Sequence, residues 1–141
     1  MKRILLTLLT AASLAAISAA PAAASSEPLR LSFDKSSVGP GLWQGTVDGD
    51  ISGSLTTVLT DVRIAGPVWH VQFDWTISAG GSSFVAALSG TLNTETGAVV
   101  MNGTVVEGFL TGAQVHEEGQ LVDAAALRFR GSIQLMPATA G

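Results

Sequence analysis

Apolar and polar residues alternate with a period of two along much of this chain. In the segment Val68 to Ala79, the apolar positions 69, 71, 73, 75, 77 and 79 alternate with polar ones. Because successive side chains of a strand point to opposite faces, the segment predicts a β-strand with one buried and one polar face. Gln72 and Asp74 are expected to be exposed. The aromatic residues expected on the buried face are Trp69, Phe73 and Trp75.

Seven further segments show the same alternation less regularly, which makes eight predicted strands. Their ranges are Leu29–Phe33, Leu42–Val47, Gly53–Ile64, Val68–Ala79, Ser83–Leu92, Ala98–Glu107, Phe109–Glu118 and Leu127–Leu135. Short turn sequences separate them, such as Asp48-Gly49-Asp50 and Gly80-Gly81. Turns of this kind are typical of antiparallel hairpins.

The short connections determine the predicted architecture. Parallel strands need crossovers of about a dozen residues, and only the segment from Gly119 to Ala126 approaches that length. We therefore predict an all-β fold, a single antiparallel up-and-down β-barrel of about eight strands, because closure removes exposed edges. A two-sheet β-sandwich is the alternative. Asp123, placed before three alanines, predicts one capped helical turn in the last connection.

The first 24 residues have the organisation of a secretory signal. Met1 to Arg3 is basic, Ile4 to Ile17 is apolar, and Ala22 to Ala24 offers a small-residue cleavage pattern. We expect cleavage after Ala24 and a single β-barrel domain over residues 25–141, located outside the cytoplasm as a secreted or periplasmic protein. Pro21 interrupts the apolar stretch before it reaches a spanning length, so no membrane anchor is expected in the mature form.

Composition narrows the function classes. The 141 residues include no Cys, which excludes disulfides, thiol nucleophiles and zinc–thiolate sites. Loss of Lys2 and Arg3 with the signal would change the formal net charge from −4 to −6, because two positive charges are removed. That charge opposes binding to nucleic acid or to an anionic membrane surface, since both require clustered basic residues.

Three segments carry a resemblance to a known group of proteins. They are Gly45–Leu55, Phe84–Leu92, and Gly108–Ala113 followed by Val115-His116-Glu117. Together they resemble the small secreted barrels of the calycin and allene oxide cyclase-like group. The resemblance implies a barrel, and the group includes cyclases as well as members with no known role. No catalytic motif of those enzymes matches this chain residue by residue, so no catalytic residue is assigned.

Few residues offer reactive chemistry. His70 and His116 are the two histidines, and there is no Gly-x-Ser-x-Gly motif of the kind that holds a serine nucleophile. Strand alternation places Glu118 on the face of His116 and Asp74 on the face of His70. The spacing of these four residues matches no established zinc pattern, so we predict no metal and no cofactor.

Three function classes remain open. The first is a secreted non-catalytic barrel that binds a small hydrophobic ligand. The second is a cyclase-like enzyme acting on a hydrophobic substrate inside the barrel, with Asn102, Glu107 or Gln114 as the polar group. The third is a structural or interaction module, including a homo-oligomer. The candidate ligand-binding residues are Trp43, Trp69, Phe73, Trp75, His116 and Glu118. An empty barrel interior would favour the first two classes.

Overall fold

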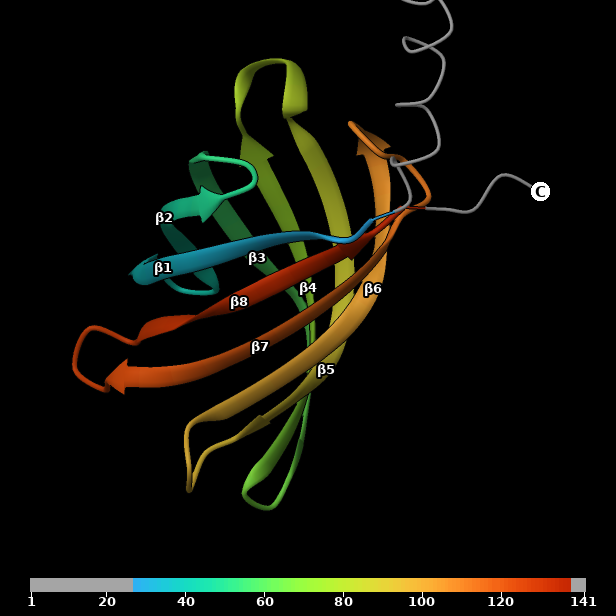
Figure 1. Ribbon diagram of the computed structural model, residues 1–141. Helices are drawn as coiled ribbons and strands as arrows, with labels where there is room; N and C mark the ends of the chain where they lie inside the picture. Colours follow the sequence, from blue (N-terminus) through green and yellow to red (C-terminus); the bar gives the residue numbers. More distant parts are fainter. Residues whose placement is uncertain (1–26, 138–141) are drawn as a thin grey trace, which may run out of the picture.

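The protein is an eight-stranded antiparallel barrel (Figure 1), seen in a computed structural model that describes residues 27–137. The strands are β1 (Leu29–Gly39), β2 (Leu42–Gly49), β3 (Gly53–Ala65), β4 (Val68–Ser78), β5 (Phe84–Asn93), β6 (Ala98–Gly108), β7 (Gln114–Asp123) and β8 (Arg128–Met136). One short 3-10 helix, η2 (Gly80–Ser82), connects β4 and β5. Within the described residues, no helix has the length and apolar character needed to cross a membrane.

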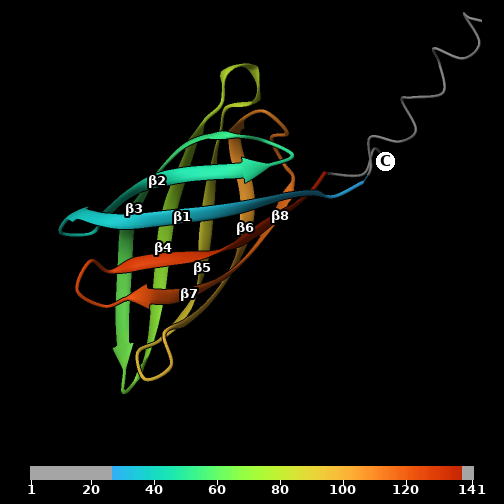
Figure 2. The same ribbon diagram turned by 60° about the vertical axis from the view of Figure 1, so that its left-hand side comes forward.

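Every strand pairs with its neighbours in sequence, and β1 pairs with β8 to close the barrel. The closing register runs from Leu29 opposite Leu135 to Lys35 opposite Phe129. Figure 2 shows β1 lying between β2 and β8 along their length. The predicted all-β, up-and-down barrel is therefore confirmed, and the sandwich alternative is not adopted.

The side chains of β4 are buried and exposed as the alternation of its sequence predicted. Phe73 and Trp75 are buried inside the barrel and Trp69 is half-buried, whereas Gln72 and Asp74 are exposed. Burial of one face of each strand produces a core inside the barrel, as expected for a small closed sheet.

Six of the predicted strands have bounds within two residues of those observed, whereas the first and the seventh differ by more. The first extends to Gly39 and not to Phe33, because Lys35 faces the interior and so breaks the expected polar-outside pattern. The seventh begins at Gln114, since residues 109–113 form a turn in which the Ala113 amide donates to the Leu110 carbonyl. The short apolar run in that turn had the composition of a strand.

The predicted helical turn after β7 was also wrong. Residues 124–127 form a turn without helix. Asp123 nevertheless caps it, because its Oδ1 accepts hydrogen bonds from the backbone amides of Ala125 (3.0 Å) and Ala126 (3.3 Å). Such local side-chain bonds compete with helix formation, and Leu127 follows with a positive φ of 48°.

The two ends of the barrel differ. At one end, the connections between β2 and β3 and between β6 and β7 insert the buried side chains of Ile51 and Ala113. We call this the packed end, and β1 begins and β8 finishes there (Figure 1). The opposite end, with the connections β1–β2, β3–β4, β5–β6 and β7–β8, is called the cavity end. The predicted signal segment lies outside the described residues.

Close approach of strands β1 and β2 requires glycine at position 45. A Cβ on Gly45 would lie 1.8 Å from the backbone oxygen of Asp34, which no side-chain movement can relieve. We expect Gly45→Ala to lower the free energy of unfolding by about 1–3 kcal/mol or more, measured by urea denaturation. Gly81→Ala is the control, because a Cβ there meets nothing within 4 Å. Equal stability of the two variants would contradict this account of strand packing.

Candidate functional site

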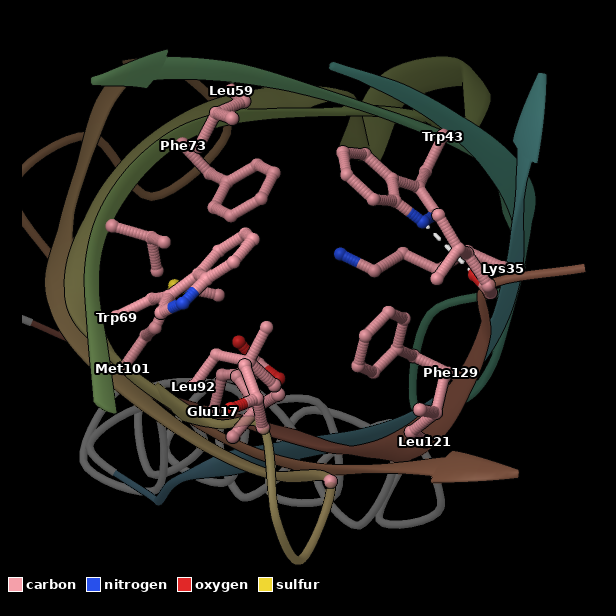
Figure 3. A pocket seen from close by; sticks show the side chains of 15 residues that line it. Lys35, Trp43, Leu59, Trp69, Phe73, Leu92, Met101, Glu117, Leu121 and Phe129 are labelled. Carbon is pink, nitrogen blue, oxygen red and sulfur yellow. Dashed lines mark hydrogen bonds between the residues drawn. The ribbon is translucent and has the colours of Figure 1, made fainter. Parts of the chain in front are cut away.

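The barrel interior is empty at the cavity end. The cavity has a volume of about 320 Å³, and four aromatic side chains from three strands surround it: Trp43 of β2, Trp69 and Phe73 of β4, and Phe129 of β8 (Figure 3). Thr94 and Leu127 also line it and are exposed, so the cavity reaches solvent at this end. Cavities of this size and apolar character are typical of sites for small molecules.

The aromatic wall is held in a defined arrangement. The ring of Trp43 packs edge-on against Phe73, with centroids 5.5 Å apart, and against Phe129, at 6.4 Å. Its indole Nε1 donates a hydrogen bond of 3.0 Å to the backbone oxygen of Leu127. Because this bond joins β2 to the β7–β8 turn, it fixes one side of the cavity mouth in place.

Below the cavity, side chains fill the barrel. Trp75 is 1% exposed and packs edge-on against Phe33, with ring centroids 5.1 Å apart. Leu31, Leu55 and Leu135 continue this core toward the packed end. The barrel interior is therefore filled with side chains toward the packed end and hollow at the cavity end.

Lys35 projects from β1 into the cavity (Figure 3) and is only 5% exposed. Its Nζ donates a hydrogen bond of 3.3 Å to Oγ1 of the buried Thr57. The same nitrogen lies 4.3 Å from the ring centroid of Trp75 and 5.0 Å from that of Phe73. An ammonium can donate three hydrogen bonds, so this group has donors to spare.

Glu117 projects from β7 into the same cavity and is 1% exposed. Its Oε1 is buried with no hydrogen-bond partner in the part of the chain that the structure describes. Gly119 lies next on the same face, where a Cβ would stand 2.8 Å from Oε2 of Glu117. The missing side chain at Gly119 thus leaves room for the carboxyl group.

Burial alters the proton affinity of both groups. The pKa of Lys35 falls from 10.5 to about 8 because burial disfavours the ammonium, although the nearby Glu117 charge opposes the change. The pKa of Glu117 rises from 4.5 to about 7 because burial disfavours the carboxylate, with Lys35 and then His116 opposing it. Among residues 27–137, neither group has an ion-pair partner within 4.0 Å. Both groups therefore change charge near neutral pH.

The six residues expected to bind a ligand do not share one place. Trp43, Trp69 and Phe73 line the cavity, and Trp75 lies beneath it. His116 and Glu118 instead lie on the outer face of β7, with His116 Nε2 2.8 Å from Glu118 Oε2. Their placement is corrected for a physical reason: Val115 and Leu121 of β7 face inward, and Glu117, on the same face, takes the interior position.

The polar candidates for a cyclase-like enzyme are also outside. Asn102, Glu107 and Gln114 are exposed, and Asn102 Oδ1 lies 2.7 Å from Nδ1 of His116 on the outer surface. His70 belongs to β4 and His116 to β7, with two strands between them. In residues 27–137 no group of three or more His, Asp or Glu side chains is arranged to hold a metal ion.

Sequence reasoning missed the two interior charges. Both were visible in the alternation, because Lys35 follows Leu31 and Phe33 at spacing two and Glu117 lies between Val115 and Leu121 on one face. They were overlooked because charged residues are normally assigned to the outside of a strand.

Comparisons with protein-family models, with curated proteins and with solved structures gave no match. The resemblance to the calycin and allene oxide cyclase-like group therefore stays a prediction from sequence.

Proposed function

We propose that this protein binds a small, largely apolar ligand in the cavity of its barrel. The observation that carries the proposal is the apolar, aromatic-lined cavity of about 320 Å³ that reaches solvent at one end. An apolar ligand bound there would bury its own apolar surface and that of the cavity wall, and each Å² removed from water stabilises the complex by about 25 cal/mol. The rigid wall around Trp43 supports binding without large rearrangement, which lowers the entropic cost.

The ligand also needs a polar group. Counting the partners offered by residues 27–137, Lys35 has unused hydrogen-bond donors and Glu117 has an unpartnered oxygen, and both line the cavity. A wholly apolar ligand would leave them unsatisfied, which is costly in a buried site. The preferred ligand is therefore an apolar molecule with one polar end that reaches these two side chains.

The other function classes have less support. A structural or interaction module needs no cavity, whereas this barrel has one. A cyclase-like enzyme needs a polar group inside the cavity, and the residues expected to supply it are exposed. Lys35 and Glu117 are the interior groups that any reaction would have to use. Export through the N-terminal signal is part of the same proposal, since a secreted barrel would meet its ligand outside the cytoplasm.

Binding is tested with N-phenyl-1-naphthylamine, a small apolar probe whose fluorescence rises in an apolar environment. We expect a saturable rise with a dissociation constant in the micromolar range. Leu121→Trp should weaken binding at least about tenfold, because Leu121 lines the cavity and a larger ring there would fill it.

Val122→Trp is the matched control for this measurement. Val122 is the next residue along β7, lies on the outer face and is 49% exposed, so its replacement should leave probe affinity unchanged. Isothermal calorimetry checks both variants without depending on fluorescence. Absence of binding to the unmodified protein, or equal weakening by both variants, would overturn the proposed function.

A further inference from the structure

Lys35 differs from every other basic residue of the described chain. The sequence has two lysines, Lys2 and Lys35, and Lys35 alone lies in the described residues. The four basic side chains on the outside of the barrel are all arginines: Arg30, Arg63, Arg128 and Arg130. Arginine stays protonated in proteins, whereas a lysine amine can lose its proton and act as a nucleophile. The one basic side chain inside the barrel is thus also the one with nucleophilic chemistry.

Burial of this amine favours its neutral form. No acidic side chain of the described residues lies within 4.0 Å of Lys35 Nζ to compensate its charge. Aromatic rings lie close to this nitrogen (Figure 3). The cavity nevertheless reaches solvent, so a ligand can enter and water can leave. Glu117 supplies a carboxyl group in the same cavity, and one of its oxygens forms no hydrogen bond with the part of the chain that the structure describes.

We propose that Lys35 forms an imine with a small apolar aldehyde bound in the cavity, and that Glu117 provides the proton that releases water. The inference rests on the proposed binding function and names the ligand class. An aldehyde fits better than a carboxylate, because a carboxylate would place a second negative charge beside Glu117. It also fits better than a simple hydrocarbon, which would leave both polar groups unsatisfied.

The reaction balances without any further reactant. The lone pair of the Lys35 amine attacks the carbonyl carbon, and a proton moves from nitrogen to oxygen to give a carbinolamine. Protonated Glu117 then donates its proton to the hydroxyl group, which leaves as water while the carbon–nitrogen double bond forms. The products are a protonated imine on Lys35, the Glu117 carboxylate as its counter-ion, and one water molecule.

The proton affinities of the two groups agree with these roles. A pKa of about 8 for Lys35 leaves roughly a tenth of the amine neutral at pH 7, far more than for an exposed lysine, and a pKa of about 7 for Glu117 leaves about half of it protonated there. General acid catalysis is most effective when the acid titrates close to the working pH. An exposed lysine and an exposed glutamate would both be in the unreactive charged form.

The test uses cinnamaldehyde with the complete chain and sodium cyanoborohydride, which reduces an imine to a stable amine. We expect one cinnamyl group per molecule in the intact mass, located on Lys35 by peptide mapping. Labelling should be at least about tenfold faster than that of free N-α-acetyl-lysine at the same pH. Without the reductant, a red-shifted absorbance band should appear and disappear on addition of hydroxylamine.

Two variants examine the roles of the side chains. Lys35→Met should abolish the internal adduct, leaving only slow labelling of Lys2 and of the N-terminus. Glu117→Gln should slow labelling of Lys35 at least about tenfold, because it keeps the shape but cannot donate the proton. Mapping of the adduct in the unmodified protein keeps the proposal falsifiable if either variant fails to fold.

Cinnamyl alcohol separates the two proposals, since it has the same shape and cannot form an imine. If the alcohol binds by calorimetry and the aldehyde labels Lys35 no faster than acetyl-lysine, the imine proposal is overturned and ligand binding stands. If neither compound binds, nor does the naphthylamine probe, the proposed function fails together with the imine. Rapid labelling confined to Lys35, together with binding of cinnamyl alcohol to the unmodified protein, supports both.

Discussion

The double variant Lys35→Met/Glu117→Met should be more stable than the unmodified protein by about 1–4 kcal/mol between pH 7 and 8. Both side chains lie inside the barrel, 5% and 1% exposed, and no ion pair within 4.0 Å in the described residues compensates their burial. Methionine fills similar volume without a charge and adapts to irregular space. Unfolding in urea at several pH values measures the difference.

The pH dependence of this difference follows from the two pKa changes. Glu117 has its pKa raised from 4.5 to about 7, so its favourable contribution is complete below about pH 4.5 and is lost as the pH rises to 7. Lys35 has its pKa lowered from 10.5 to about 8, so its contribution is complete above about pH 10.5 and is lost as the pH falls to 8. The unmodified protein therefore has a minimum of stability between pH 7 and 8 that the double variant lacks.

An external ion pair provides the control. Arg128 Nε donates to Asp34 Oδ1 over 2.8 Å on the outer surface, and this bond together with the Arg128 charge lowers the pKa of Asp34. An Asp34→Asn/Arg128→Gln variant should lose stability relative to the unmodified protein above acidic pH and keep the minimum between pH 7 and 8. If the free energy of unfolding of Lys35→Met/Glu117→Met depended on pH in the same way as that of the unmodified protein, Lys35 and Glu117 would be solvated and this account would be wrong.

Much of the fold could be predicted from the sequence because the relevant signal is local. From Val71 to Ser78 the positions of β4 alternate between core and solvent, and the period of two by itself identifies Trp75 as internal and Asp74 as external. Short turns then permit only antiparallel neighbours. Closure of β1 on β8 joins residues about a hundred positions apart, and it was inferred from the cost of exposed edges rather than from any residue pair.

The candidate site was predicted less well, for a related reason. Aromatic residues such as Trp43 and Phe73 were assigned to a cavity wall because they are large and apolar, and they line it. Lys35 and Glu117 could not be placed by the same rule, since their burial is unfavourable in isolation and depends on a cavity formed by several distant strands. His116 and Glu118 were selected for their chemistry, although the strand face on which they lie points outward.

Trp75→Ala should lower the free energy of unfolding by about 3–5 kcal/mol, enough to unfold a domain of ordinary stability. Trp75 is 1% exposed, packs edge-on against Phe33 and lies opposite Thr57 and Ala86 on the flanking strands. Its Nε1 has no hydrogen-bond partner in the described residues, so the loss comes from packing and from the hole left in the core. Circular dichroism during urea denaturation measures it.

Trp69→Ala is the matched control, because it removes the same side chain from the same face of β4 at a position beside the open cavity. Trp69 is only half-buried, and its removal enlarges a space that already reaches solvent. We therefore expect Trp69→Ala to cost clearly less stability than Trp75→Ala and to weaken probe binding. A loss below about 1 kcal/mol for Trp75→Ala, or equal losses for the two variants, would contradict a barrel that is filled with side chains toward the packed end and hollow at the cavity end.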